Sequence, residues 1–370
     1  MKIATILGAR PQFIKAMPVS RALRRAGHTE HVIHTGQHYD HGMSGVFFSE
    51  LELDAPYRNL GVGSGSHGKQ TGESLIRIEE ILAELSPDWV LVYGDTNSTL
   101  AGALSAAQSG IPLAHVEAGL RSYNRGMPEE LNRVLTDHMA SLLLCPTETA
   151  VANLHREGIT SGVALTGDTM YDAVLLYSGM ARQKSNILST LGLQEKTFCV
   201  ATVHRTYNTD VVGNLKGIVT ALRQFDSPVV FPVHPRTRQR LKDCFGPDFS
   251  RQTGNLIMID PLGYLDMLML QQSARLVLTD SGGMQKEAYF LGVPCITLRP
   301  ETEWVETVQS GWNVLAGANP SAILSAAAKT DWPQGPPVPL FGDGHAAERI
   351  VAEMQSHSEA LRGHPPADPQ

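Results

Sequence analysis

Short apolar runs rich in β-branched residues alternate with longer stretches of helical periodicity, and this alternation restricts the possible folds more than any other feature of the sequence. Strands separated by helices predict right-handed βαβ crossovers and therefore parallel sheets. The strands expected in the first half are residues 3–7, 31–35, 89–93, 111–116 and 141–146. The helices expected among them include residues 11–26, with a kink at Pro18, 44–53 and 74–85. The first half is thus predicted to be one doubly wound α/β domain.

A second series of strands follows the polar stretch 182–196. These strands are expected at residues 197–203, 229–233, 256–259, 276–279 and 295–298. A chain of 370 residues also exceeds the usual size of one hydrophobic core. The sequence therefore predicts two α/β domains, residues 1–170 and 171–344, that face each other across a cleft. A helix at 345–362 is expected to pack back on the N-terminal domain, and residues 363–370 are expected to be frayed.

The charge balance and the cysteines exclude several classes of protein. The formal charge of -7 has the wrong sign for broad attraction to a nucleic-acid backbone. Four cysteines lie far apart without CxxC spacing, so we expect neither a metal site nor a disulfide framework. No signal-peptide core and no run of 18 apolar residues occurs. We therefore expect a cytoplasmic protein with no membrane and no nucleic-acid partner.

Two glycine-containing segments are candidates for phosphate binding. The first expected strand ends at Gly8-Ala9-Arg10-Pro11, and a strand-to-helix turn offers N–H groups to an anion, to which Arg10 and Lys15 would add charge. Residues 63–69 have the GxxxxGK spacing of a P-loop, but Gln70 replaces the Ser or Thr that would hold magnesium. We interpret residues 61–70 as a mobile glycine loop or lid. The absence of GxGxxG argues against a nicotinamide cofactor.

Acidic residues follow two neighbouring strands. Asp95 ends the strand 89–93 and Glu117 ends the strand 111–116, so both are predicted to lie at the edge where ligands bind. Helix capping is an alternative role for Asp95 but explains Glu117 less well, because Glu is a poor N-cap. Glu129 follows Pro128 in an expected first helical turn, where the helix dipole alone accounts for an acid.

Histidines follow two strands of the second half. His204 and Arg205 follow the strand 197–203, and a histidine there is suited to donate to a phosphate or to transfer a proton near neutral pH. His234 closes the next strand, where an ordinary structural role is an equal alternative.

Ser281, Gly282 and Gly283 follow the strand 276–279 and open an expected helix. This turn would let the backbone approach a diphosphate at the helix N-terminus, and Glu287 would accept hydrogen bonds from ribose hydroxyls. The alternative is a glycine-rich turn capped by Asp280 or Ser281, which leaves Glu287 unexplained.

Seven segments, in this order and spacing, resemble the non-hydrolysing UDP-N-acetylglucosamine 2-epimerases. They are GARP, GDTNST, HVEAGLRS, MPEELNR, HR, PVHPR and TDSGGMQKEA. The resemblance extends over nearly the whole chain. It implies two Rossmann-like domains of the glycosyltransferase B type, UDP binding by the C-terminal one, a UDP-sugar substrate, no redox cofactor, a homodimer and a role in polysaccharide biosynthesis.

The resemblance also assigns roles to residues. The family's catalytic positions fall on Asp95, Glu117, Glu129 and His204. The predicted substrate-binding set is Arg10, Lys15, Arg205, His234, Ser281, Gly282, Gly283 and Glu287. The implied reaction eliminates UDP to give 2-acetamidoglucal and adds UDP back after protonation of the opposite face of C2, which yields the manno epimer.

The sequence departs from the family pattern at three places. Tyr207 stands where many members have Glu, and residues 37–43 depart from the QHxxMLDQ stretch linked to activation by substrate. Trp304 stands where many relatives place a substrate-contacting Arg. Four alternatives therefore stay open: an epimerase of a UDP-diacetamido uronic acid, a hydrolysing epimerase that releases N-acetylmannosamine, a glycosyltransferase of the same fold, and a catalytically idle UDP-sugar sensor.

Overall fold

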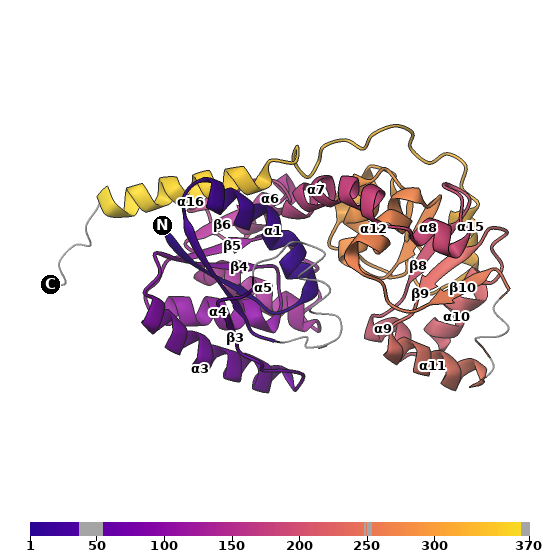
Figure 1. Cartoon of the computed structure of the whole chain (residues 1–370), viewed down its shortest axis with the longest axis horizontal. Coiled ribbons are helices and arrows are strands. Elements are labelled where there is room, and N and C mark those ends of the chain that lie inside the picture. The colour runs from indigo at the N-terminus through magenta and orange to yellow at the C-terminus, as the bar shows by residue number, and fades with distance from the viewer. Residues whose placement is uncertain (37–54, 248, 250–253, 364–370) are drawn as a thin grey trace. The chain divides into compact units, whose positions relative to one another are not determined.

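The protein, described by a computed structural model over residues 1–36, 55–247, 249 and 254–363, forms two compact units (Figure 1). Unit 1 comprises Met1–Ala173 and Leu340–Gln370, and unit 2 comprises Val174–Pro339. The chain therefore leaves unit 1, forms unit 2 and returns to unit 1. The assignment of separate functions to the two predicted domains stays a prediction.

Unit 1 contains a parallel sheet whose strand order within the described residues is β3-β2-β1-β4-β5-β6-β7. Its strands are β1 (Lys2–Leu7), β2 (Thr29–His34), β3 (Arg58–Asn59), β4 (Trp89–Tyr93), β5 (Leu113–Val116), β6 (Leu142–Cys145) and β7 (Val163–Leu165). The chain builds the sheet outward from β1 in one direction and then resumes beside β1 with β4. The carboxyl ends of β1 and β4 therefore form a topological switch point, where doubly wound sheets bind ligands.

Helices connect these strands. They are α1 (Arg10–Arg25), α3 (His67–Leu85), α4 (Asn97–Gln108), α5 (Pro128–Met139), α6 (Glu148–Arg156), α7 (Thr169–Lys184), which runs on into unit 2, and α16 (Ala346–Gly363). The last helix packs against α1, as Figure 1 shows. The buried Asp172 accepts hydrogen bonds from the backbone N–H groups of Ala346 (3.2 Å) and Ala347 (2.8 Å), and so holds the start of α16.

Unit 2 repeats this topology with the strand order β10-β9-β8-β11-β12-β13, again all parallel. Its strands are β8 (Cys199–Thr202), β9 (Val229–Pro232), β10 (Leu256–Ile259), β11 (Leu276–Thr279), β12 (Cys295–Thr297) and β13 (Asn313–Leu315). Its further helices are α8 (Ile187–Leu191), α9 (Thr206–Thr209), α10 (Val212–Leu222), α11 (Pro235–Phe245), α12 (Tyr264–Ser273), α13 (Gly282–Phe290), α14 (Val305–Gln309) and α15 (Pro320–Ala327). The switch point of this sheet lies between β8 and β11.

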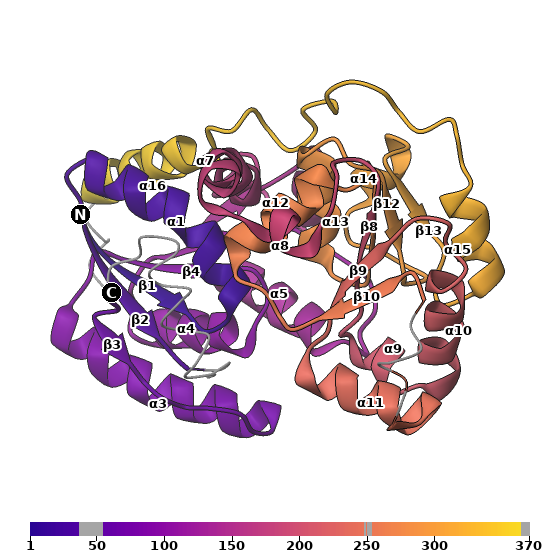
Figure 2. The ribbon, with the colours of Figure 1, turned by 45° about the vertical axis from the view of Figure 1, so that its right-hand side comes forward.

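Burial explains why these segments are strands. Every residue of β4, β8 and β11 is buried, as expected for parallel strands that are covered by helices on both faces. In unit 2, side chains of β8, β9 and β11 pack on one face with α10 and α15, which lie side by side in Figure 2. The predicted strands at 89–93, 256–259 and 276–279 are reproduced residue for residue.

One sequence interpretation is wrong in part. Of the expected glycine loop at 61–70, the second part is helical, because α3 begins at His67 and Ser66 accepts a hydrogen bond from the N–H of Lys69 as its N-cap. The preceding Val62 and Gly63 donate backbone hydrogen bonds to Thr35 and Gly36. The helix predicted at 44–53 and the residues 37–43 that differ from the family pattern lie outside the described residues.

Within the described residues, no helix is both long and apolar enough to cross a membrane.

Candidate functional site

The two switch points carry most of the predicted site residues. In unit 1, Lys15 follows β1, Asp95 follows β4 and Glu117 follows β5. In unit 2, His204 and the turn at Ser281 follow the adjacent strands β8 and β11. Each sheet therefore presents its own set of polar residues at its carboxyl edge.

Glu117 is held in an uncommon conformation. Its φ is +67°, in the left-handed region, which costs about 1–3 kcal/mol in a residue other than glycine. Its carboxylate is buried and forms an ion pair with Lys15, whose Nζ donates to Oε2. A Cβ on Gly94, which has φ +61°, would lie 3.3 Å from Glu117 Oε2, so the preceding turn closely approaches this carboxylate. Backbone strain that is stabilised by its surroundings is characteristic of functional sites.

Asp95 is bound by α5. Its carboxylate accepts a hydrogen bond from Arg133 Nη2, and its carbonyl oxygen accepts one from Asn132 Nδ2 at 2.9 Å. Thr96, and not Asp95, is the N-cap of α4, since Thr96 Oγ1 accepts from the N–H of Thr99. The capping alternative for Asp95 is therefore wrong.

The first turn of α5 contains two acids with different surroundings. Glu129 is half-buried, whereas Glu130 is buried and accepts hydrogen bonds from the N–H groups of Ser122 (2.9 Å) and Tyr123 (2.8 Å) and from Arg133 Nη1 (2.9 Å). Glu130 thus fixes both the loop before the helix and the arginine that binds Asp95. Sequence reasoning did not single out Glu130 or Arg133, because their roles depend on contacts with Ser122 and Asp95 across the fold.

The turn after β1 differs from its interpretation as an anion site. The N–H groups of Gly8 and Ala9 donate to Gln12 Oε1 at 2.8 and 2.9 Å. Gln12 Nε2 in turn donates to the carbonyl oxygen of Tyr93 at 2.7 Å. The amide of Gln12 therefore occupies two of the N–H groups of the turn that was predicted to bind phosphate.

A buried network lies behind the acidic turns. His115 of β5 contacts Asp137 Oδ1 with Nδ1 (2.7 Å) and the carbonyl oxygen of Gly94 with Nε2 (2.8 Å). Asp137 Oδ2 accepts from Gly119 N–H (3.1 Å) and Arg121 Nη1 (2.7 Å). Burial raises the pKa of Asp137, but the charges of His115 and Arg121 outweigh it, so this pKa lies below its ordinary value.

The corresponding buried acid of unit 2 is Asp280, which is fully buried. It accepts hydrogen bonds from the backbone N–H groups of His204 (3.1 Å) and Arg205 (3.0 Å) and from Asn208 Nδ2 (3.0 Å). Its Oδ1 also lies 3.3 Å from His204 Nδ1. Asp280 therefore joins the end of β11 to the loop after β8 and orients His204. Of the two caps that the alternative offered, Ser281 is the N-cap residue of α13, without a side-chain hydrogen bond, and Asp280 is not.

His204 is 48% exposed and remains accessible to a ligand. Its pKa lies below the ordinary value for histidine, because desolvation and the nearby Arg205 and His234 outweigh the attraction of Asp280. Neutral imidazole is thus the favoured form near neutral pH. It can donate a hydrogen bond or accept a proton.

The turn that opens α13 is crowded on one side. A Cβ on Gly282 would lie 2.3 Å from Glu303 Oε1 and 3.1 Å from Trp304 Nε1. Glu303 pairs with the buried Arg299 at 3.0 Å, and Lys286 Nζ lies 3.9 Å from the centre of the Trp304 ring. Gly282 is thus required for packing against residues 303 and 304, and Trp304 is tied to the predicted diphosphate turn.

Two further predicted residues have structural contacts. Gln271 Nε2 donates to Glu287 Oε2 at 2.7 Å, so one oxygen of this buried carboxylate is held by the protein. His234 is the N-cap of α11, and its Nδ1 accepts from the N–H of Arg236 at 3.4 Å. The capping contact agrees with the structural alternative for His234.

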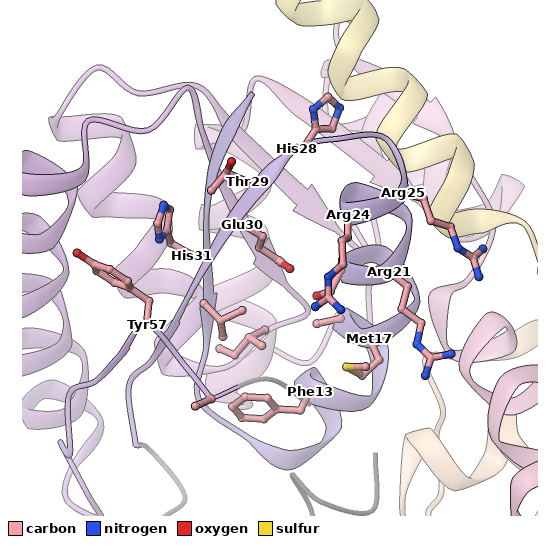
Figure 3. Close-up of a pocket in the computed structure, with 15 residues that line it drawn as sticks. Phe13, Met17, Arg21, Arg24, Arg25, His28, Thr29, Glu30, His31 and Tyr57 are labelled. Carbon is pink, nitrogen blue, oxygen red and sulfur yellow. The ribbon is translucent and has the colours of Figure 1, made fainter. Parts of the chain in front are cut away.

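A cavity of about 760 Å³ in unit 1 lies elsewhere. It lies between α1 and β2 (Figure 3), and its lining includes Phe13, Met17, Arg21 and Arg24 of α1 and Glu30 of β2. None of the predicted site residues lines it. Within the described parts of the chain there is also no cluster of three metal-ligating side chains, and all four cysteines are free thiols.

Comparison with known proteins agrees with these observations. The model of the family described as UDP-N-acetylglucosamine 2-epimerase matches residues 21–355. A UDP-N-acetylglucosamine 2-epimerase homolog of Methanococcus maripaludis is 52% identical over 96% of this chain and 100% of its own length. A UDP-2,3-diacetamido-2,3-dideoxy-D-glucuronate 2-epimerase of Pseudomonas aeruginosa is 46% identical over 95% of this chain and 98% of its own length.

Among solved structures, Methanocaldococcus jannaschii UDP-GlcNAc 2-epimerase, in complex with UDP-GlcNAc and UDP, has a TM-score of 0.88 and 44% identity, over 96% of this chain and all of that one. The predicted pair of Rossmann-like parallel sheets and the predicted isomerase class are confirmed. The full-length matches and the strand-end acids lead to the same conclusion: the chain belongs to the UDP-N-acetylglucosamine 2-epimerase family.

Proposed function

We propose that the protein interconverts UDP-N-acetylglucosamine and UDP-N-acetylmannosamine by elimination and re-addition of UDP. The observation that supports this most is the pair of acids at the switch point of unit 1, each bound to a cation. Glu117 pairs with Lys15 and Asp95 with Arg133. An inversion at C2 needs groups that move protons on both faces of the sugar, and strand-end carboxylates are suited to this.

The hydrogen at C2 is not acidic while UDP is attached, so departure of UDP comes first. The C1–O bond breaks, its electron pair leaves with the diphosphate, and C1 becomes an oxocarbenium ion. A carboxylate then removes the C2 proton, and the C–H electrons form the C1–C2 double bond of 2-acetamidoglucal. Protonation of C2 from the opposite face and return of UDP to C1 give the manno epimer. Carboxylates near C1 stabilise the cation electrostatically.

Unit 2 supplies groups suited to the departing UDP. The turn at Ser281, Gly282 and Gly283 opens α13, whose N-terminus favours an anion. His204 is exposed and fixed by Asp280, so its neutral ring would be available for proton transfer beside the diphosphate. Glu287 would bind the ribose. Arg10, Arg205 and His234 complete the proposed binding set, and Glu129 is proposed as a third acid of the reaction.

A UDP-diacetamido uronic acid is the second candidate substrate. It is favoured by the Pseudomonas aeruginosa relative, whose name states that sugar and which is 46% identical. Trp304 lies close to Gly282, in the turn of residues 281–283, and to Lys286. Substitutions at residue 304 are therefore the ones whose effects should be compared between the two substrates.

Incubation with each UDP-sugar in deuterated water tests the proposal. UDP-N-acetylglucosamine should acquire deuterium at C2 and yield the manno nucleotide. Faster exchange of the uronate would favour the second candidate, and accumulation of free N-acetylmannosamine would select a hydrolysing enzyme. If the protein still bound UDP but exchanged the C2 hydrogen of neither UDP-sugar, that result would contradict an epimerase function for the chain.

We further propose a cytoplasmic homodimer that needs no redox cofactor. Sedimentation velocity would show a species of twice the chain mass, and extensive dialysis, with no nicotinamide or flavin added to the assay and none visible in the absorbance of the protein, would leave turnover unchanged. A monomeric active enzyme would contradict the first statement, and loss of activity on dialysis would contradict the second.

A further inference from the structure

His115 occupies the space between the two acidic turns of unit 1. It lies on β5, two residues before Glu117, and its side chain has no exposed surface. Its Nε2 contacts the carbonyl oxygen of Gly94, the residue before Asp95, at 2.8 Å. Its Nδ1 contacts Asp137 Oδ1 at 2.7 Å. One ring therefore contacts the turn of Asp95 and a side chain of α5.

Both partners of the ring are acceptors. The carbonyl oxygen of Gly94 can only accept, so Nε2 donates to it, while Nδ1 lies against the Asp137 carboxylate. These two contacts on opposite sides of a wholly buried ring fix its orientation.

Asp137 extends this link to the turn of Glu117. Its Oδ2 accepts from the N–H of Gly119, two residues after Glu117, at 3.1 Å. It also accepts from Arg121 Nη1, and Arg121 forms two further 2.7 Å hydrogen bonds with Glu157. The Asp95 turn and the Glu117 turn are consequently held by one continuous buried network.

Such a network has a reason to exist here. The left-handed backbone of Glu117 persists only if its surroundings over-determine it, and proton transfer requires each carboxylate within a fraction of an ångström of its proper place. Since His115 is wholly buried, it cannot touch a substrate.

We propose that His115 is a positioning residue that sets the spacing of Asp95 and Glu117 through its hydrogen bond to Gly94. This rests on the proposed function of the two acids. The contact to Gly94 serves this purpose, whereas the contact to Asp137 serves to orient the ring.

Two substitutions separate these contacts. In His115→Asn the amide nitrogen lies near the position of Nδ1, so it reaches Asp137 but not Gly94. In His115→Gln the amide nitrogen lies near the position of Nε2, so it reaches Gly94 but not Asp137. Both replace the imidazole ring by a neutral amide, with one methylene more in Gln, so each serves as the other's control for loss of the ring.

We expect kcat for C2 exchange to fall about 100-fold or more in His115→Asn and at most about tenfold in His115→Gln. The affinity for UDP should stay within about twofold of the wild-type value in both variants, because most of the proposed UDP contacts lie in unit 2. Equal losses of kcat in the two folded variants, or a larger loss in His115→Gln, would overturn the proposal.

A crystal structure of each variant gives a readout that does not depend on activity. The Gly94–Asp95 turn should be displaced in His115→Asn and remain in place in His115→Gln. If the wild-type enzyme exchanges the C2 hydrogen of no UDP-sugar, the proposed function fails, but the two crystal structures still test the positioning role of His115. The same position of the Gly94–Asp95 turn in both variants would overturn that role. If neither variant folds, His115→Phe, which fills the space and makes neither contact, tests the same link, and an undisplaced Gly94–Asp95 turn with unchanged kcat there would overturn the proposal.

Discussion

Lys15 Nζ donates a hydrogen bond to Glu117 Oε2, and so joins the first helix of the chain to an acid whose φ is +67°. The two residues are 102 positions apart in sequence. A cation beside a buried carboxylate favours its ionised form and compensates for its burial. The pair therefore connects backbone geometry, charge and the proposed chemistry at one point.

Removal of the cation at residue 15 should impair turnover more than folding. Lys15→Met is expected to lower kcat about 100-fold, because Glu117 loses the partner that orients it and holds its charge. Lys216→Met, at an exposed position of α10, is the matched control and should leave kcat unchanged. Steady-state kinetics with thermal denaturation of both variants checks this. A melting temperature that falls in proportion to kcat would indicate a purely structural pair.

Asp280 should be a structural requirement of unit 2. Asp280→Asn replaces a carboxylate that accepts from two backbone N–H groups and Asn208 with an amide that has one acceptor oxygen. The expected loss of unfolding free energy is about 2–4 kcal/mol. Asp243→Asn on the exposed side of α11 should cost less than about 0.5 kcal/mol. Urea denaturation measures both, and equal small losses would contradict the role given to Asp280.

Substitution of glycine by alanine should have opposite effects at Gly282 and Gly72. Gly282→Ala places a Cβ 2.3 Å from Glu303 Oε1, so the turn or residues 303 and 304 must shift, and UDP affinity should fall about tenfold or more. Gly72→Ala, in α3 with nothing within 4 Å of the new Cβ, should stabilise the protein by about 0.5–1 kcal/mol. Calorimetric titration with UDP and thermal melting test the pair. Unchanged UDP affinity in Gly282→Ala would separate this turn from nucleotide binding.

His204 gives the expected dependence on pH. Its pKa in the folded protein lies below the value of about 6.5 expected for the unfolded chain. As the pH falls below 6.5 the unfolded chain binds the proton first, so the contribution of this residue to stability is present above about pH 6.5 and is lost as the pH falls through the folded pKa.

The acid limb of kcat/KM should accordingly have its midpoint below about pH 6.5. His204→Asn is expected to lower kcat about 100-fold with a small change in melting temperature, and to abolish this limb. A limb that persists unchanged in His204→Asn would assign it to another group.

Strands with a high apolar content were predictable from sequence. Those at 89–93, 256–259 and 276–279 are correct at both ends, although the second of them, β10, lies at the edge of its sheet. The short edge strands β3, β7 and β13 were not predicted, since each has two or three residues and includes exposed positions. Strands this short acquire their conformation from pairing with a neighbour, which a local pattern does not record.

Residues of the candidate site were predictable from sequence only where their position directly after a strand was enough to identify them. Asp95, Glu117 and His204 were identified in this way. Gln12 was not, because its role is to satisfy two N–H groups and the carbonyl oxygen of residue 93, and no local pattern distinguishes it from a polar residue in a first helical turn. Arg133, Asp280 and His115 likewise depend on partners distant in sequence.

The return of the chain to unit 1 has a consequence for biosynthesis. Trp89 Nε1 donates to Ser358 Oγ at 2.7 Å, and α16 packs on α1, so the covering of the first sheet depends on residues that are synthesised after unit 2. On the ribosome, unit 2 is contiguous and can fold as it emerges, whereas the N-terminal sheet waits with the surface under α16 uncovered. A nascent chain that is released early would thus expose this surface and be a natural target for chaperones and proteases.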